Sequence, residues 1–343
     1  MQRRTFLSAS LAAGLAPAAI TAREKSGTKN AIVGEGEHKY ECHHNWGKLP
    51  AKLSWQTTHG VCVDAEGLIY IKMQGTGNQP QDTIVVFDPK GKFVRSFGKE
   101  YHGGGHGIDL RKEDGKEYLY LTNSWRRTFC KTTLTGEPVW TKCFPDQPNK
   151  YHTVEQFSPT NVAFHPDGGF YVGDGYGSHL IHQYDKANKW VRTWGGFGDK
   201  PGLMKTPHGI WLDDRKGREP SLVVADRANK RLQYFTLEGK HLSFVEGLLF
   251  PANIDTRGEV MLVPDLHARV TLYGKDNKVL AQLGDDEAWR AKALDGFKMR
   301  QTPEKCPAGK FIHPHDACFD KDGNIFVVEW VQTGRVSLLK KLA

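Results

Sequence analysis

A repeating unit is the feature of this 343-residue chain that most restricts its fold. Each copy starts with His or Asn before an apolar strand, and further short apolar strands follow, separated by Gly, Asn and Asp turns. The six starts lie 47, 55, 47, 45 and 62 residues apart, at His59, His106, Asn161, His208, Asn253 and His315. Four short strands within such a spacing are typical of one propeller blade. The sequence therefore predicts an all-β, six-bladed β-propeller.

The last copy ends near Val336, before a fourth strand, which would leave an open sheet edge. The segment 40–47 resembles the fourth-strand endings of other copies, such as 192–195. We therefore expect an N-terminal strand to close the ring. The expected division is a leader at 1–22, a linker at 23–38 and a propeller at 39–343, with an insertion at 285–312 that contains a short helix.

The first 22 residues resemble a bacterial twin-arginine (Tat) signal peptide. Arg3 and Arg4 precede an apolar run that ends near Ile20 and is too short to span a membrane. We expect a periplasmic or secreted protein, with an uncleaved signal anchor as the alternative. Proteins exported by this route commonly fold around a metal or cofactor first, which favours such a group here.

The formal net charge of +8 is spread along the chain, and its longest basic runs are pairs. Nucleic-acid binders concentrate such an excess in a stripe. We therefore expect no nucleic-acid partner, no stable membrane insertion, and a monomer that binds a small-molecule or peptide substrate. The six cysteines form no CxxC pair, which disfavours a cysteine zinc site. Cys130 with Cys143 and Cys306 with Cys318 are candidate disulfides, and free buried thiols are the alternative.

Four of the six repeat starts are histidines. The first strand of each blade lies nearest the propeller axis, so equivalent positions face one another across the channel. Three histidines on a rigid scaffold form an open zinc site with room for water or substrate. Each single histidine could instead bond the turn between two blades. Because several converge on one axis, we favour a metal, and we expect Asn161 and Asn253 to be structural.

Several short segments carry a family resemblance over most of the chain. They are Gly173-Asp174-Gly175-Tyr176, Trp190 to Gly195, Thr206-Pro207-His208-Gly209, Val224 to Gln233, Asp82 to Pro89, His106-Gly107 and Pro314-His315-Asp316. In this order they resemble the lyase domain of peptidylglycine α-amidating enzymes, the peptidyl-α-hydroxyglycine α-amidating lyases. The form of residues 224–235 also resembles NHL repeats, so we expect a propeller of NHL type.

The resemblance implies a zinc-dependent lyase that cleaves the C–N bond of a carbinolamide such as a peptidyl-α-hydroxyglycine. The matching positions are His106, His208 and His315 for zinc, Asp316 for a structural calcium, and Tyr176 and Arg227 for catalysis. Zinc would polarise the substrate hydroxyl, and Tyr176 would take its proton as general base. The histidines come from blades two, four and six, so the resemblance agrees with the threefold spacing of the repeat.

One departure bears on the substrate. The family's arginine in blade one, which engages the substrate carboxylate, is replaced here by the stretch Lys72 to Gly75. We therefore expect carboxylate-bearing substrates to bind weakly. Tyr176 could instead pack at a blade edge, and Arg227 could bridge blades. The alternative function is a non-catalytic propeller that binds periplasmic peptide or polysaccharide. A calcium-dependent lactonase is disfavoured, because its axis would be acidic and rich in Asn.

Overall fold

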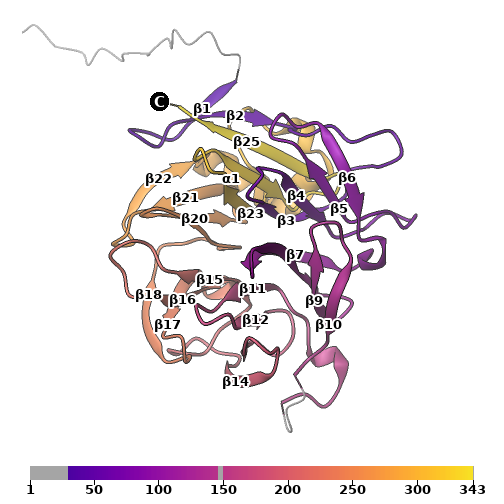
Figure 1. The fold of residues 1–343 in the computed structure, drawn as a ribbon. Helices are drawn as coiled ribbons and strands as arrows, with labels where there is room; N and C mark the ends of the chain where they lie inside the picture. Colours follow the sequence, from indigo (N-terminus) through magenta and orange to yellow (C-terminus); the bar gives the residue numbers. More distant parts are fainter. Residues whose placement is uncertain (1–29, 146–149, 343) are drawn as a thin grey trace, which may run out of the picture.

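The computed structural model describes residues 30–145 and 150–342. In these ranges 25 strands form six antiparallel sheets arranged in a ring (Figure 1). The prediction of an all-β, six-bladed propeller is confirmed. The predicted leader at 1–22 lies outside the described residues. None of the helices in the described ranges is long and apolar enough to cross a membrane.

Each of the first three blades follows the chain from the inner to the outer strand. Blade 1 contains β3 (Thr58–Val63), β4 (Ile69–Met73), β5 (Ile84–Phe87) and β6 (Phe93–Phe97). Blade 2 contains β7 (Gly105–Glu113), β8 (Lys116–Asn123), β9 (Thr128–Thr133) and β10 (Pro138–Lys142). Blade 3 contains β11 (Asn161–Phe164), β12 (Phe170–Asp174), β13 (Leu180–Tyr184) and β14 (Trp190–Gly195).

The last three blades continue the ring. Blade 4 contains β15 (Pro207–Asp213), β16 (Ser221–Asp226), β17 (Arg231–Phe235) and β18 (His241–Val245). Blade 5 contains β19 (Asp255–Arg257), β20 (Val260–Asp265), β21 (Arg269–Tyr273) and β22 (Val279–Leu283). Blade 6 contains β23 (Pro314–Phe319), β24 (Ile325–Glu329), β25 (Arg335–Lys341), β2 (Tyr40–His44) and β1 (Ala31–Val33).

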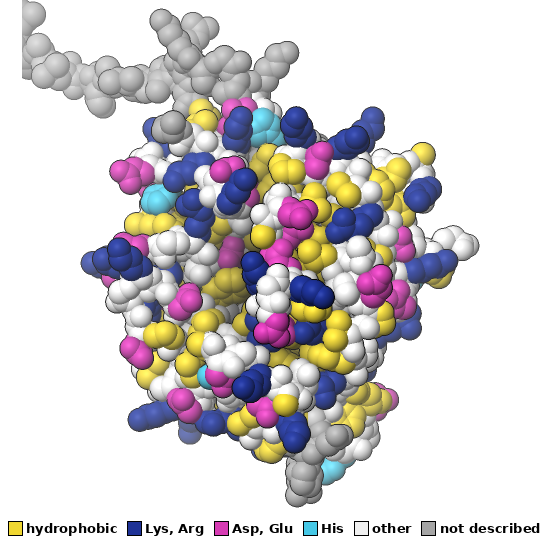
Figure 2. Space-filling view, in the orientation of Figure 1, with side chains coloured by type: hydrophobic (Ala, Val, Ile, Leu, Met, Phe, Trp, Pro, Cys, Tyr) yellow, Lys and Arg dark blue, Asp and Glu magenta, His cyan; other side chains and the backbone are white. Residues whose placement is uncertain are grey.

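The core lies between neighbouring blades. The second and third strands of a blade are apolar on both faces and fully buried, as in β4 and β5, whereas the outer strand β6 is partly exposed. One apolar cluster joins blades 1 and 6, and another joins blades 1 and 2. Basic and acidic side chains are interspersed over the face shown in Figure 2. The scaffold is therefore rigid near the axis, where the inner strands present their first residues.

The Asp-x-x-Gly element of the repeat forms the turn after the inner strand. In blade 1 the Asp64 carboxylate accepts a hydrogen bond from the Leu68 amide at 2.8 Å, and Gly67 has a φ of 87°. A left-handed φ strains residues that have a Cβ, so glycine is favoured at this position. Asp320 and Gly323 occupy the equivalent turn in blade 6, where Gly323 has a φ of 83°. The turn explains why these two residue types recur.

The ring closes through the N-terminal strand, as expected. β2 pairs antiparallel with β25, with Cys42 opposite Leu339. β1 then pairs with β2 and adds a fifth strand, although its residues fall in the range expected to be a linker. This strand has only three residues and no repeat pattern, so it could not be expected from the sequence. Its Val33 side chain belongs to the same apolar cluster as Phe311, which explains why the segment is ordered as a strand.

Removing the closing strand is expected to destabilise the protein strongly. Deleting residues 39–47 exposes the edge of β25 and removes the buried side chains Tyr40 and Cys42. We expect the melting temperature to fall by about 10 °C or more, since each large buried side chain contributes roughly 1.5–3 kcal/mol. Deleting only 31–33 should cost much less, because β1 closes no blade. A 39–47 deletion that melts with the parent in calorimetry would contradict this closure.

The insertion between blades 5 and 6 contains the expected short helix. The helix α1 (Glu287–Leu294) begins after Asp286, whose side chain accepts a hydrogen bond from the Trp289 amide. Two 3-10 turns follow, η4 (Asp295–Gln301) and η5 (Pro303–Lys305). The Trp289 side chain packs against Ile312 and so fixes the helix to the segment that leads into β23. The insertion is therefore attached to the propeller at both ends.

The two candidate disulfides are wrong, because all six cysteines are free. The Cys130 thiol contacts the Tyr101 hydroxyl inside the sheet interface, while Cys143 donates to the carbonyl of Arg127. Cys318 is buried in the innermost strand β23, and Cys306 lies outside the blade, in the insertion. Residues near each other in sequence are thus separated by the blade geometry.

Candidate metal centre and catalytic site

A β-bulge places each histidine of the repeat at the start of its inner strand. The register of β7, β15 and β23 shifts at His106, His208 and His315, and that of β3 shifts at His59. A bulge re-aims a side chain that would otherwise follow the pleat. All four imidazoles are buried. The bulge therefore turns them toward the axis, as the repeat predicted.

The residue after the histidine must be small in two of these blades. A Cβ at Gly107 would lie 2.6 Å from the Thr160 carbonyl oxygen, and one at Gly209 would lie 2.5 Å from Asn253. Each glycine thus allows the next blade to approach the bulge closely. This explains the His-Gly pairs of the repeat as packing features that set the positions of the histidines.

The imidazoles of His106, His208 and His315 form a nearly equilateral triangle. Their ring centroids are 4.8 Å (106–208), 4.9 Å (106–315) and 4.7 Å (208–315) apart. The Nε2 atoms of His106 and His208 are 3.1 Å apart. The structure therefore brings together the three histidines that the sequence analysis selected for a metal, although they are separated by about a hundred residues each.

Each of these three imidazoles bonds the neighbouring blade through Nδ1. The acceptors are the main-chain oxygens of Thr160 for His106 at 2.7 Å, Ala252 for His208 at 2.5 Å, and His59 for His315 at 2.7 Å. A carbonyl only accepts, so Nδ1 must carry the proton. In the neutral imidazole Nε2 is then unprotonated and available as a ligand. Hydrogen bonding of the second ring nitrogen is typical of histidines that bind metals.

The donor set fits a cation. Burial, followed by the neighbouring imidazoles and Arg227, lowers the pKa of His106, His208 and His315 well below the usual value, so the neutral form that binds metals persists. Two unprotonated nitrogens facing each other at 3.1 Å repel unless a cation lies between them. Tetrahedral zinc with nitrogen ligands at 2.0–2.1 Å separates them by about 3.3 Å. The three histidines could therefore hold a divalent metal.

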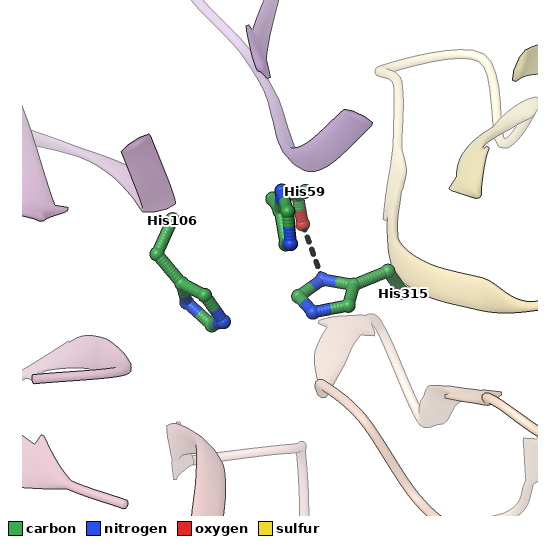
Figure 3. A group of neighbouring side chains, drawn as sticks. All are labelled: His59, His106 and His315. Atoms are coloured by element: carbon green, nitrogen blue, oxygen red, sulfur yellow. Dashed lines mark hydrogen bonds between the residues drawn. The ribbon is translucent and has the colours of Figure 1, made fainter. Parts of the chain in front are cut away.

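His59 makes a second, overlapping triad possible. His59, His106 and His315 each place a nitrogen within 4.8 Å of the others, and Figure 3 shows their rings around a common space. Burial lowers the pKa of His59 to about 3. Its Nδ1 has no hydrogen-bond partner among the described residues, so no main-chain oxygen of a neighbouring blade orients this ring as it does the rings of the other three. We favour the triad with His208, because all three of its members are oriented by Nδ1.

Tyr176 and Arg227 lie beside the triad. The Tyr176 hydroxyl is 2.9 Å from Nε2 of His208 and 3.3 Å from Nε2 of His106. Arg227 donates a hydrogen bond from Nη1 to the same hydroxyl at 3.1 Å. The tyrosine follows β12, and the arginine begins η3 (Arg227–Asn229) after β16. The pair thus places a proton carrier, with a cation beside it, next to the Nε2 atoms of His106 and His208.

Asp316 lies on the other side of the triad. Its carboxylate accepts hydrogen bonds from the Val61 amide at 2.9 Å, the Asn253 side chain at 2.6 Å and the Ala317 amide at 2.8 Å. Burial raises its pKa to about 8. Asn161 donates in turn to the Asn253 side chain at 2.7 Å. Both carboxylate oxygens therefore already accept hydrogen bonds, and this arrangement does not supply the six to eight oxygens that calcium requires.

His106 and His315 of the triad, together with His59, line a cavity of about 530 Å³, and His208 is not among its lining residues. Its wall is largely apolar and aromatic, and it includes no Asp or Glu. The lining residues are His59, Gln74, Thr76, Gly104, Gly105, His106, Ser124, Trp125, Tyr176, Arg227, Phe250, Leu266, Phe297, Arg300, His315 and Trp330. Apart from Tyr176, the aromatic residues and Arg300 were missed from sequence, because they lie on connections between strands that do not follow the repeat.

Blade one contributes no cation to this cavity. The ammonium of Lys72 is buried between blades 1 and 2 and donates to the Gly107 and Thr122 carbonyls at 3.2 and 2.8 Å. Burial lowers its pKa to about 7. Gln74, two residues on, lines the cavity instead. Lys72 thus faces away from the site.

Sequence comparison relates the chain to amidating enzymes. It is 29% identical over 272 residues to the mouse peptidyl-glycine α-amidating monooxygenase, a match covering 75% of this chain and 25% of that protein. It is an NHL-like propeller that resembles the amidating-lyase domain. The Drosophila melanogaster peptidyl-α-hydroxyglycine α-amidating lyase 1 is 27% identical over 167 residues, which are 45% of this chain and 29% of that protein. The chain thus spans only about a quarter of the length of these relatives.

Two further similarities, to an NHL-repeat protein and to a solved structure, bear on the fold and not on the activity. Mouse NHL repeat-containing protein 3 is 29% identical over 189 residues, 52% of this chain and 51% of that protein. Virginiamycin B lyase from Staphylococcus aureus superposes with a TM-score of 0.54 at 12% identity, covering 88% of this chain and all of that one. No family model matches the chain.

Proposed function

We propose that the protein is an exported, zinc-dependent lyase that cleaves the C–N bond of a carbinolamide such as a peptidyl-α-hydroxyglycine. The observation that carries this proposal is the position of the Tyr176 hydroxyl, 2.9 and 3.3 Å from the unprotonated Nε2 atoms of His208 and His106, beside the three-histidine cluster. The resemblance to amidating lyases supports the same reaction class. A zinc or similar divalent ion held by His106, His208 and His315 would supply Lewis acidity to the substrate's hydroxyl oxygen.

Tyr176 would act as the general base. The hydrogen bond from Arg227 would stabilise the deprotonated phenolate form of Tyr176, whose oxygen then accepts the proton of the substrate hydroxyl. The hydroxyl oxygen forms a carbonyl with its carbon, and the C–N bond breaks with its electron pair going to nitrogen. The proton on Tyr176 passes to that nitrogen. The products are an amide and an aldehyde-bearing acid such as glyoxylate, and no water is consumed.

Export by the twin-arginine route is part of the proposal. It rests on Arg3, Arg4 and the short apolar run after them. Replacing both arginines with lysine should keep the precursor in the cytoplasm, because the pair is the address that the route reads. Fractionation that finds the variant delivered like the parent would contradict this route.

The reaction is tested with N-benzoyl-α-hydroxyglycine, the simplest aromatic compound of this class. Protein stripped with a chelator and protein reloaded with zinc are compared, and benzamide and glyoxylate are both quantified. We expect equal amounts of the two products from the loaded protein and background release from the stripped one. If the zinc-loaded protein binds N-benzoyl-α-hydroxyglycine but releases no glyoxylate, the lyase proposal fails and a binding propeller becomes the better account.

A further inference from the structure

The insertion before blade 6 delivers two side chains to the cavity above the triad. Phe297 and Arg300 both belong to η4 and both line the cavity. Phe297 has a φ of 54°, a left-handed value that is unfavourable for a bulky side chain. Between them, Met299 packs against the apolar cluster that holds Trp289. The turn is thus anchored on one side and presents Phe297 and Arg300 on the other.

The contacts of Arg300 fix the orientation of its guanidinium. Nε donates to the Trp330 carbonyl at 3.0 Å, and the guanidinium carbon lies 3.2 Å from the centroid of the Trp330 ring. The amide of Gln332 donates to the Arg300 carbonyl at 3.0 Å. Stacking on an aromatic face leaves the edge of the guanidinium with its two Nη groups free to bind. No hydrogen bond from either Nη atom to a described residue is found.

The positive charges of Arg227 and Arg300 have no acidic side chain beside them among the residues that line this cavity. Within the described residues neither the buried Arg227 nor the partly buried Arg300 has a carboxylate partner, whereas the buried Arg335 pairs with Glu329 at 2.6 Å. Burial lowers the pKa of Arg300, the direction expected when no anion offsets the loss of water. Since enclosed charges are normally paired, a ligand that carries a negative charge would complete the site.

We propose that Arg300 is the carboxylate-binding residue of this cavity and that the ligand is an N-acylated, α-amino-acid-like anion with an apolar acyl group. Arg227 already donates from Nη1 to the Tyr176 hydroxyl, whereas neither Nη group of Arg300 donates to a described residue. The acyl group would lie along Trp125 and Phe250, which line the same space. The inference rests on the proposed function for the reacting bond. It replaces the expectation that carboxylate-bearing substrates bind weakly for lack of an arginine in blade one.

Binding without turnover tests this inference. N-benzoylglycine lacks the hydroxyl and cannot react, and N-benzoylglycinamide is its neutral counterpart. Calorimetric titration of the zinc-loaded protein should show the anion binding at least about 10-fold tighter than the amide, the size expected for a charge-assisted hydrogen bond. In Arg300→Gln this preference should fall to within about 3-fold, and Arg300→Lys should restore part of it. Lys298→Gln is the matched control, since Lys298 is an exposed cation of the same turn.

The titration is repeated on chelated protein, because a carboxylate could also bind zinc directly. An anion preference that disappears with the metal and is unaffected by Arg300→Gln would overturn the proposal. A preference that depends on Arg300 in both states supports it, even if no aldehyde is released, in which case only the lyase proposal fails. With turnover, Arg300→Gln should raise KM for N-benzoyl-α-hydroxyglycine more than it lowers kcat. A lower kcat at unchanged KM would contradict a binding role.

Discussion

Replacing Tyr176 with phenylalanine is expected to lower kcat by about 100-fold or more, the usual span for losing a general base. The Tyr176 hydroxyl can carry a proton, and it lies 2.9 Å from Nε2 of His208 and 3.3 Å from Nε2 of His106. Phenylalanine keeps the ring but has no atom to accept the proton. The metal content should not change, because the proposed ligands are the three imidazoles. Steady-state kinetics and elemental analysis of the same preparation measure both effects.

A second tyrosine of the same blade provides the control. Tyr171 on β12 donates to the Leu237 carbonyl at 2.8 Å, and it does not line the cavity. Tyr171→Phe should therefore keep kcat within about twofold and cost at most a modest amount of stability. Were Tyr176→Phe as active as this control, the tyrosine would be a packing residue and the proposed proton path would be wrong.

Replacing His208 with alanine should remove the metal and reduce turnover to the background level. An open site with two imidazoles in place of three lacks the ligand number typical of catalytic zinc. We expect dialysed wild-type protein to retain about one zinc per chain and His208→Ala to retain almost none. His59→Ala is the matched control, because it removes a neighbouring buried imidazole whose Nδ1 is not held by another blade. It should keep most of the metal.

The metal content of these two variants also shows which of the two overlapping triads holds the metal. If His59→Ala loses the metal and His208→Ala retains it, the ligands are His59, His106 and His315. That result would contradict the account, because Tyr176 lies 2.9 Å from the imidazole of His208. Elemental analysis after dialysis against a weak chelator measures both variants under the same conditions.

Much of the fold followed from the spacing of the repeat. The repeat contains a turn such as Asp64 to Gly67 and a first position that is histidine in four copies. From this pattern alone the four histidines could be predicted to lie near one axis. Ring closure could be predicted from Tyr40 onward, because β25 would otherwise have an unpaired edge. β1 could not be predicted, since three residues give no periodicity.

The cavity was less predictable than the axis. Arg300 lies in an insertion that has no counterpart in other blades, so the repeat says nothing about its direction. Which ring nitrogen of each histidine carries the proton could not be predicted from the sequence either. It depends on main-chain oxygens such as that of Thr160, and any residue type supplies such an oxygen. The sequence therefore predicted the axial histidines, whose positions follow from the symmetry of the repeat. It did not predict cavity residues such as Arg300, which lie on connections between strands.

X-ray absorption at the zinc edge of the loaded wild-type protein tests the central claim most directly. The account predicts scattering from three imidazole nitrogens at about 2.0–2.1 Å together with one oxygen ligand at a similar distance, as in an open catalytic site. It also predicts that this pattern is unchanged in His59→Ala. Four imidazoles, a sulfur ligand at about 2.3 Å, or a spectrum that changes in His59→Ala but not in His208→Ala would contradict a metal centre built from His106, His208 and His315.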